Sequence, residues 1–254
     1  MIEELRGKVV IVTGGATGIG AAVSRAFGRC GCRVVVHHHT GAEAAAGLAE
    51  EIRAAGGEAL TLPGDVTRPG VVEGIVDRAA ETFGRIDVLV NNAGTMVGRR
   101  PLAEIDDAFF DAVFDLNARS VVRACKAALP IFRRQGGGAI INVSSISART
   151  GGSPGSSLYS ASKAFVATFT RALARELAPD RIRVNAVSPG TIHTRFHDTF
   201  STPEKLERTR VTIPLERLGT PEDCAGTFLY LASDRLSGYV TGQVLEVNGG
   251  QLMP

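Results

Sequence analysis

The sequence predicts an α/β fold in which a doubly wound parallel sheet of about seven strands carries helices on both faces. Two observations lead to this fold class. Short β-branched runs recur along the 254 residues, and stretches rich in alanine, leucine and arginine with helical period lie between them. This alternation is typical of right-handed strand–helix–strand units.

The expected strands are apolar on both faces, as strands covered on two sides must be. The first is the run Val9-Val10-Ile11-Val12, and the last is Val244-Leu245-Glu246-Val247. The seven expected strands span 9–12, 34–36, 59–62, 88–90, 140–143, 184–187 and 244–247. The expected helices between them span 18–29, 42–55, 69–83, 104–134, 158–177 and 221–232.

We expect residues 1–254 to form a single domain, because no proline- or serine-rich linker and no internal repeat divides them. The stretch 188–220 contains three prolines, Pro189, Pro203 and Pro214, is followed directly by Pro221, and lacks a clear strand. Irregular segments of this length within a compact domain are usually functional. We therefore interpret it as a substrate lid.

Composition excludes several classes of protein. The net charge of +2 is too small to hold a nucleic acid by electrostatics, so we expect no nucleic-acid partner. Glu3 and Glu4 stand where a signal peptide carries positive charge, and no apolar run is long enough to span a bilayer. We expect a soluble cytoplasmic protein without a membrane partner. The four scattered cysteines, Cys30, Cys32, Cys125 and Cys224, are then reduced thiols.

A glycine-rich loop directly follows the first strand. Its sequence, Thr13-Gly14-Gly15-Ala16-Thr17-Gly18-Ile19-Gly20, opens into the first helix. Glycines let the backbone turn sharply and approach a ligand, and a helix N-terminus offers unpaired N–H groups to a pyrophosphate. At this end of the first strand the loop predicts a Rossmann-type dinucleotide site. The alternative is a glycine-rich turn that binds nothing.

Tyr159 and Lys163 lie four residues apart on an expected helix, so both side chains project from one face. A tyrosine hydroxyl has an ordinary pKa of about 10, and a neighbouring ammonium lowers that pKa by favouring the phenolate. The pair is therefore a candidate acid–base centre. The alternative is a surface tyrosine with an ordinary neighbour.

Taken together, the motifs resemble those of the short-chain dehydrogenase/reductase family. Besides the loop, they are Asp65-Val66, Asn91-Asn92-Ala93-Gly94, Asn117, Ser144-Ser145, Tyr159-Ser160-Ala161-Ser162-Lys163 and Pro189-Gly190, in the family's order. The resemblance runs from Lys8 to the Val247-Asn248-Gly249-Gly250 ending.

The resemblance implies an oxidoreductase with four catalytic residues. Tyr159 would exchange a proton with the substrate, and Ser145 would hold the substrate oxygen. Lys163 would bind the nicotinamide ribose, and Asn117 would bind a water that links Lys163 to solvent. The interval from Ser145 to Tyr159 is one residue longer than in many members, so Ser144 and Ser147 remain lesser candidates.

The resemblance also implies the cofactor contacts. They are Gly14, Thr17, Gly18, Ile19, Gly20, Asp65, Val66, Asn91, Ala93, Gly94, Tyr159, Lys163, Pro189, Gly190, Ile192 and Thr194. Asp65 would bind the adenine amino group, with Val66 against the ring and Asn91 beneath the adenine ribose. Ile192 and Thr194 would touch the carboxamide and a phosphate. Asp65 could instead cap a turn, and Ile192 could simply fill the lid.

The end of the second strand bears on the choice of cofactor. An acid there, about 20 residues past the glycine loop, would select NAD by binding the ribose 2′-OH. This chain has His38, His39 and Thr40 instead, so nothing repels a 2′-phosphate. We expect NADP(H) to be preferred, with NAD(H) as the alternative, since the glycine loop lacks an arginine. Neighbouring strand residues point to opposite faces, so we expect no metal at the histidines.

The expected partner is a small-molecule carbonyl or alcohol substrate. The sequence looks most like bacterial 3-oxoacyl-carrier-protein reductases, with sugar or polyol dehydrogenases as the alternative and a non-catalytic dinucleotide-binding sensor as a distant one. The expected pocket linings are Met96, Val97, Phe196 and Phe200 with Arg99, Arg100, Arg149, His193 and Arg195. The resemblance also implies a homotetramer, with helices 104–134 and 158–177 packed across a two-fold axis.

Overall fold

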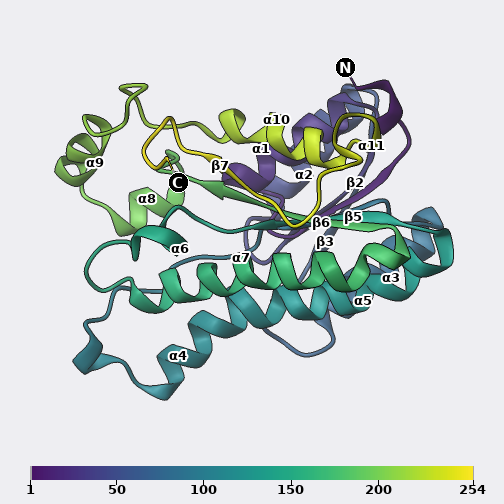
Figure 1. Cartoon of the computed structure of the whole chain (residues 1–254). Coiled ribbons are helices and arrows are strands. Elements are labelled where there is room, and N and C mark those ends of the chain that lie inside the picture. Colours follow the sequence, from purple (N-terminus) through teal and green to yellow (C-terminus); the bar gives the residue numbers. More distant parts are fainter. Residues whose placement is uncertain (1, 254) are drawn as a thin grey trace.

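The computed structural model describes residues 2–253, which form a seven-stranded sheet in the order β3-β2-β1-β4-β5-β6-β7 (Figure 1). Every neighbouring pair of strands is parallel. The strands are β1 (Val9–Val12), β2 (Arg33–His38), β3 (Glu58–Pro63), β4 (Val88–Asn91), β5 (Gly138–Val143), β6 (Ile182–Pro189) and β7 (Val244–Val247).

Helices cover both faces of this sheet, with α3, α5 and α7 on one face and α1, α2 and α10 on the other (Figure 1). The helices are α1 (Gly18–Arg29), α2 (Ala42–Ala54), α3 (Val71–Phe83), α4 (Asp107–Phe114), α5 (Ser120–Gln135), α6 (Ser147–Thr150), α7 (Ser157–Leu177), α8 (Arg195–Phe200), α9 (Pro203–Arg210), α10 (Pro221–Ala232) and α11 (Asp234–Ser237).

Successive residues of each central strand enter two separate apolar clusters. In β1, Val10 and Val12 pack under α1 and α10, whereas Ile11 packs under α3 and α5. In β5, Ile141 and Ile140 divide in the same way. Because both faces are buried, the strands need β-branched residues at every position rather than at alternate ones. The predicted fold class is confirmed.

The long helix predicted over 104–134 is present, since the chain is helical without interruption over 107–135, but it is not α-helical throughout. A π-helical turn (Asp115–Arg119) joins α4 to α5. The Asp106 carboxylate starts α4 by accepting a hydrogen bond from the Phe109 N–H at 2.7 Å. π-helical turns inside helices are rare and often occur at functional sites. Here the turn contains Asn117.

The segment 188–220, predicted as an irregular lid, is partly helical. It contains the end of β6 and the helices α8 and α9. Pro203 occupies the first position of α9, where a missing N–H costs nothing, and Thr202 caps that helix. The prolines that suggested irregular structure therefore mark a helix start as well as turns.

All four cysteines are buried free thiols. Burial raises the pKa of Cys32, Cys125 and Cys224 to about 12, so these thiols are protonated near neutral pH. Within residues 2–253, no helix has the length and apolar character needed to cross a membrane.

Candidate active site

The glycine loop joins β1 to α1 at the carboxyl edge of the sheet, where the strand order changes direction between β1 and β4. Gly14 and Gly18 have φ values of 61° and 54°, which other residues rarely adopt. A Cβ at Gly20 would collide with the Gly14 carbonyl, so this glycine allows α1 to pack closely on the loop. The first turn of α1 carries no acid. The loop and helix therefore fit the pyrophosphate of a dinucleotide.

The side chains of His37 and Asn92 hold the loop in place. Nδ1 of His37 accepts a hydrogen bond from the Gly14 N–H at 3.0 Å, and Nε2 lies 3.0 Å from the Gly64 carbonyl oxygen. This arrangement requires the neutral imidazole with its proton on Nε2. Burial lowers the pKa of His37, which favours this neutral form. The Asn92 amide donates to the carbonyl oxygens of Thr13 and Gly14 at 2.9 and 3.0 Å.

The end of β2 carries no carboxylate. His38 is buried, and its Nδ1 has no hydrogen-bond partner within residues 2–253, whereas His39 and Thr40 are exposed. Oδ1 of Asp65 accepts hydrogen bonds from the N–H and hydroxyl of Thr67 at 3.0 and 2.7 Å. Asp65 therefore caps a turn, and its second oxygen lies 3.7 Å from the Arg68 guanidinium.

A cavity of about 820 Å³ opens beside the glycine loop. Among the predicted cofactor and catalytic residues, it is lined by Gly14, Thr17, Gly18, Ile19, Ala93, Gly94, Ser145, Tyr159, Lys163, Pro189, Gly190, Ile192 and Thr194. The predicted residues outside this lining are Gly20, His38, His39, Thr40, Asp65, Val66, Asn91 and Asn117.

Asn91 and Ile192 have structural partners of their own. The Asn91 amide donates to Asn142 Oδ1 at 2.9 Å and lies 3.4 Å from the Cys125 sulfur, so this side chain is committed to the protein interior. Ile192 is buried in the core and also borders the cavity.

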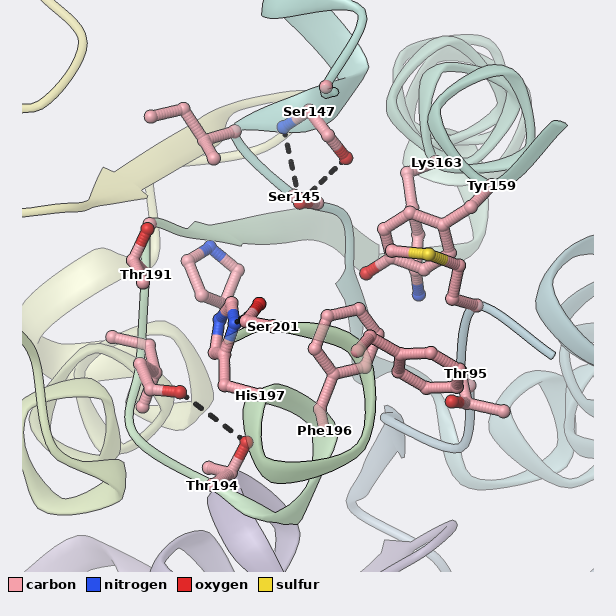
Figure 2. Close-up of a pocket in the computed structure, with 18 of the residues that line it drawn as sticks. Thr95, Ser145, Ser147, Tyr159, Lys163, Thr191, Thr194, Phe196, His197 and Ser201 are labelled. Atoms are coloured by element: carbon pink, nitrogen blue, oxygen red, sulfur yellow. Dashed lines mark hydrogen bonds between the residues drawn. The ribbon is translucent and has the colours of Figure 1, made fainter. Parts of the chain in front are cut away.

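Tyr159 and Lys163 project from α7 toward this cavity (Figure 2). The Lys163 Nζ lies 5.8 Å from the centroid of the Tyr159 ring and donates a hydrogen bond to the Val143 carbonyl at 2.9 Å. Lys163 is almost fully buried, whereas Tyr159 keeps partial access to the cavity. The helical spacing of four residues thus brings both groups to one wall.

The expected lowering of the Tyr159 pKa is wrong for this arrangement. Burial raises the pKa of Tyr159 to about 12, and the nearby Ser145 hydroxyl offsets only part of the rise. Burial also lowers the pKa of Lys163 to about 8. The ammonium lies over the ring and is hydrogen-bonded to a carbonyl, so desolvation outweighs its attraction for a phenolate. Tyr159 is thus protonated at neutral pH, as a proton donor must be.

Three neighbouring serines follow β5, and their hydroxyls differ in use. The Ser144 hydroxyl donates to the Lys163 carbonyl at 2.9 Å and is committed to α7. The Ser145 oxygen accepts from the Ser147 hydroxyl at 2.9 Å and from the Ser147 N–H at 3.2 Å (Figure 2). The hydrogen of the Ser145 hydroxyl is then left to donate to the Tyr159 oxygen or to a ligand oxygen beside it, which favours Ser145 over Ser144 and Ser147.

Asn117 lies behind the cavity wall and is fully buried. Its amide donates to the carbonyl oxygens of Thr95 and Val113 at 2.8 and 2.9 Å. Its own oxygen, Oδ1, has no partner among the described residues. A Cβ at Gly94 would lie 2.6 Å from this oxygen and 3.0 Å from the Lys163 Nζ. A buried acceptor this close to the lysine fits a bridging water.

The substrate side of the cavity agrees only in part with the predicted linings. Met96, Phe196, Phe200, Arg99 and Arg195 border it. The prediction is wrong for Val97, Arg100, Arg149 and His193, which lie outside it. Arg100 instead pairs with Asp106 at 3.1 Å, and Val97 and His193 are exposed.

Several lining residues were missed from the sequence. They include Ser153, His197, Lys205, Leu206 and Gln251. The lid prediction included the positions of His197 and Lys205, but the helical phase of α8 and α9 decides which side chains face inward. Nothing local marks Gln251, whose Oε1 accepts from the Thr191 N–H at 3.1 Å.

Comparisons with known proteins identify the class of protein that has this fold and site. A family model described as enoyl-(acyl carrier protein) reductase matches residues 14–251. A 3-oxoacyl-[acyl-carrier-protein] reductase of Synechocystis sp. is 39% identical, covering 99% of this chain and all of the relative. An L-rhamnose-1-dehydrogenase of Scheffersomyces stipitis is 41% identical, covering 98% of each chain.

A solved structure is similar throughout. The crystal structure of the NADH-dependent reductase A1-R′, described as responsible for alginate metabolism, has a TM-score of 0.91 at 39% identity, covering 99% of this chain and 100% of that one. The same reductase has also been crystallised in complex with NAD.

The fold, the glycine loop and the Ser145–Tyr159–Lys163 wall define an oxidoreductase that acts on CH–OH groups with NAD(P). The chain belongs to the short-chain dehydrogenase/reductase family.

Proposed function

We propose that the enzyme interconverts a carbonyl and a secondary alcohol on a small, hydroxyl-rich compound derived from a sugar. The observation that carries this proposal is the lining of the substrate side. Hydroxyl groups border it from the loop after β5 and from the lid, including those of Ser147, Ser153, Thr199, Ser201 and Thr209. Such groups match a polyhydroxylated substrate better than an acyl chain.

Two relatives also support a sugar-derived substrate. The Scheffersomyces stipitis relative is an L-rhamnose dehydrogenase, and the A1-R′ reductase is described as acting in alginate metabolism. On the strength of the lining hydroxyls and these two relatives we propose the sugar-derived substrate first, although the sequence alone favoured the thioester.

Reduction of a 3-oxoacyl thioester remains the second candidate. The Synechocystis relative has this activity, and Met96, Phe196, Phe200 and Leu206 give the cavity an apolar part. The Phe196 ring centroid lies 5.5 Å from that of Tyr159 and 5.1 Å from that of Phe200, so part of this apolar surface adjoins the catalytic tyrosine.

In the proposed reaction, Tyr159 donates its hydroxyl proton to the substrate oxygen in reduction and accepts it back in oxidation. Ser145 holds the same oxygen through its free hydroxyl hydrogen. Lys163 returns a proton to Tyr159, and a water that the Asn117 oxygen would hold in the space beside Gly94 would reprotonate Lys163. The nicotinamide cofactor, when bound on the glycine loop, supplies or accepts the hydride.

For the cofactor we propose a preference for NADP(H) over NAD(H). The proposal rests on the end of β2, where His38, His39 and Thr40 leave no carboxylate to repel a 2′-phosphate. The A1-R′ relative is NADH-dependent, so a direct comparison is needed. We expect a higher kcat/KM with NADPH, and a preference for NADH would overturn the assignment.

A homotetramer is the proposed assembly. Exposed aromatic surface on two helices supports contact between protomers. Phe110 and Phe165 are partly exposed, and each stacks on a phenylalanine of its own helix, Phe110 on Phe114 at 4.5 Å and Phe165 on Phe169 at 5.6 Å between ring centroids. A monomeric mass in solution would reject it.

The substrate proposal is tested by following nicotinamide absorbance with two panels. One panel contains keto- and aldehydo-sugars with their alcohols, and the other contains 3-oxoacyl thioesters. We expect turnover of the sugar panel that disappears in Tyr159→Phe. Turnover confined to thioesters would replace the first candidate with the second.

A further inference from the structure

We infer that the substrate carries a carboxylate, which Arg99 and Lys205 hold at the lid end of the cavity. This inference rests on the proposed function, because it names the class of sugar-derived compound as a carbonyl-containing acid. Three observations carry it. They are the contacts of the two cations, the lack of acidic residues in the described cavity lining, and the course of the lid from the glycine loop past Tyr159 to Phe200.

Arg99 and Lys205 converge on one hydroxyl. Nη1 of Arg99 and Nζ of Lys205 each donate to the Ser153 oxygen at 2.8 Å. Their chain positions are far apart, since Arg99 follows β4 and Lys205 lies on α9. Two like charges held on one hydroxyl repel each other, and an anionic group bound between them would offset this repulsion. The arrangement therefore favours a ligand that carries an anionic group.

Hydrogen bonds to backbone carbonyls hold the Arg99 guanidinium in place. Nε of Arg99 donates to the Phe200 carbonyl at 3.1 Å, and Nη1 also reaches the Pro154 carbonyl at 3.1 Å. Nη2 has no hydrogen bond to any residue between 2 and 253. Nη2 therefore keeps two donors that can bind a carboxylate oxygen, while the other nitrogens hold the guanidinium in place.

No acid compensates this charge. Aspartate and glutamate are absent from the described residues that line the cavity, and neither Arg99 nor Lys205 has an ion-pair partner in the described chain. Burial, and then the nearby Arg99 and Arg208, lower the pKa of Lys205. Burial lowers the pKa of His197 to about 4, with Lys205 contributing, so this histidine is neutral. The site is thus net positive in the absence of substrate.

The position of the pair assigns it to the substrate rather than to the cofactor. The lid begins beside the glycine loop, where a Cβ at Gly18 would lie 3.4 Å from Thr194. It then passes Tyr159 through Phe196 and reaches Phe200, whose ring centroid lies 5.1 Å from that of Phe196. Arg99 holds the carbonyl of this same Phe200. The cations therefore lie at the end of α8 away from the glycine loop.

A matched pair of ligands tests the inference by binding alone. Gluconate and glucitol have the same six-carbon chain and differ at one end, where gluconate has a carboxylate. Calorimetry on enzyme saturated with reduced cofactor avoids turnover of either compound. We expect gluconate to bind at least about tenfold more tightly than glucitol, as a charge-assisted contact predicts.

The variants Arg99→Gln and Lys205→Gln should each remove most of this preference. Arg208→Gln is the matched control, because it removes a charge from the exposed face of the same helix and does not border the cavity. Because Arg99 also anchors the lid, Lys205→Gln is the decisive variant, and thermal melting checks the fold of each protein. Equal binding of the two ligands, no binding of gluconate, or a preference that survives in Lys205→Gln would overturn the inference.

The outcome is separable from that of the proposed function. A carboxylate preference that depends on Lys205, in an enzyme that turns over no sugar-derived compound, would keep the anion site and reject the function. Turnover of neutral sugars with no preference for gluconate would keep the function and reject the anion site.

Discussion

The amide oxygen of Asn117 and the ammonium nitrogen of Lys163 both lie against Gly94. A Cβ at that position would be 2.6 Å from the oxygen and 3.0 Å from the nitrogen. The glycine therefore leaves the space in which a lysine, an unpartnered buried acceptor and a water can exchange a proton.

Gly94→Ala should lower kcat by about 10²-fold, because the new methyl group displaces Lys163 from Tyr159 and displacements of about 1 Å cost that much in a positioned site. Gly94 has no positive φ, so backbone strain is not the cause. Initial rates and thermal melting, measured on the same protein, separate lost catalysis from lost folding.

Gly74→Ala is the matched control. This glycine lies inside α3 with nothing within 4 Å of an added Cβ. We expect unchanged kcat and a free energy of unfolding higher by about 0.5–1 kcal/mol, the usual gain from replacing glycine in a helix. A similar loss of activity in both variants would argue against a special role for the space beside Gly94.

The three serines after β5 should respond differently to replacement by alanine. Ser145→Ala should lower kcat by about 10²-fold, as expected when one donor to a reacting oxygen is removed. Ser147→Ala should lower it less, because Ser147 acts by orienting the Ser145 hydroxyl. Ser144→Ala should lower the free energy of unfolding by about 1 kcal/mol with little loss of kcat, since its hydroxyl bonds the Lys163 carbonyl. Steady-state kinetics and denaturant titration measure these effects. A larger kcat loss in Ser144→Ala than in Ser145→Ala would reverse the assignment.

Lys163 should make the protein more stable as pH rises above 8. Burial lowers its pKa from 10.5 to about 8, so between these values the unfolded chain binds a proton that the folded chain has released. Stability then increases with pH. Relative to Lys163→Met, the free energy of unfolding should rise by about 2 kcal/mol between about pH 7.5 and 9.5. Denaturant titrations of both proteins at the two pH values provide the measurement. Parallel pH dependence would show that Lys163 has an ordinary pKa.

His38→Asp should shift the cofactor preference toward NAD(H). A carboxylate at the end of β2 repels a 2′-phosphate and can accept a hydrogen bond from a ribose 2′-OH. We expect kcat/KM for NADPH to fall by about tenfold or more, while the value for NADH is kept or improved. The exposed His39→Asp serves as a comparison one position further along. If neither variant changes the ratio, the end of β2 does not select the cofactor.

Much of the fold was predictable because its signals are local and repeated. Runs such as Val9–Val12 are apolar at every position, which identifies strands buried on both faces. The π-helical turn at Asn117 was not predictable, since the sequence around it has ordinary helical period throughout. The π-helical turn there comes with hydrogen bonds from Asn117 to Thr95 and Val113, and Thr95 belongs to a separate loop.

The residues of the site also divide into those that the sequence could predict and those that it could not. The glycine loop, Tyr159 and Lys163 were predictable because their spacing within one short segment is itself the signal. The convergence of Arg99, Ser153 and Lys205 was not, because three separate segments supply these residues. The pKa of Tyr159 was predicted in the wrong direction because spacing shows the neighbouring charge but not the depth of burial.

The most direct test of the account compares the wild type with Tyr159→Phe, using reduced cofactor and a sugar-derived carbonyl compound. Phenylalanine keeps the ring and its contact with Phe196 but removes the proton. The account predicts that kcat falls by about 10²- to 10⁴-fold while cofactor affinity and melting temperature are retained. A variant that kept wild-type kcat would contradict the assignment of Tyr159 as the proton donor.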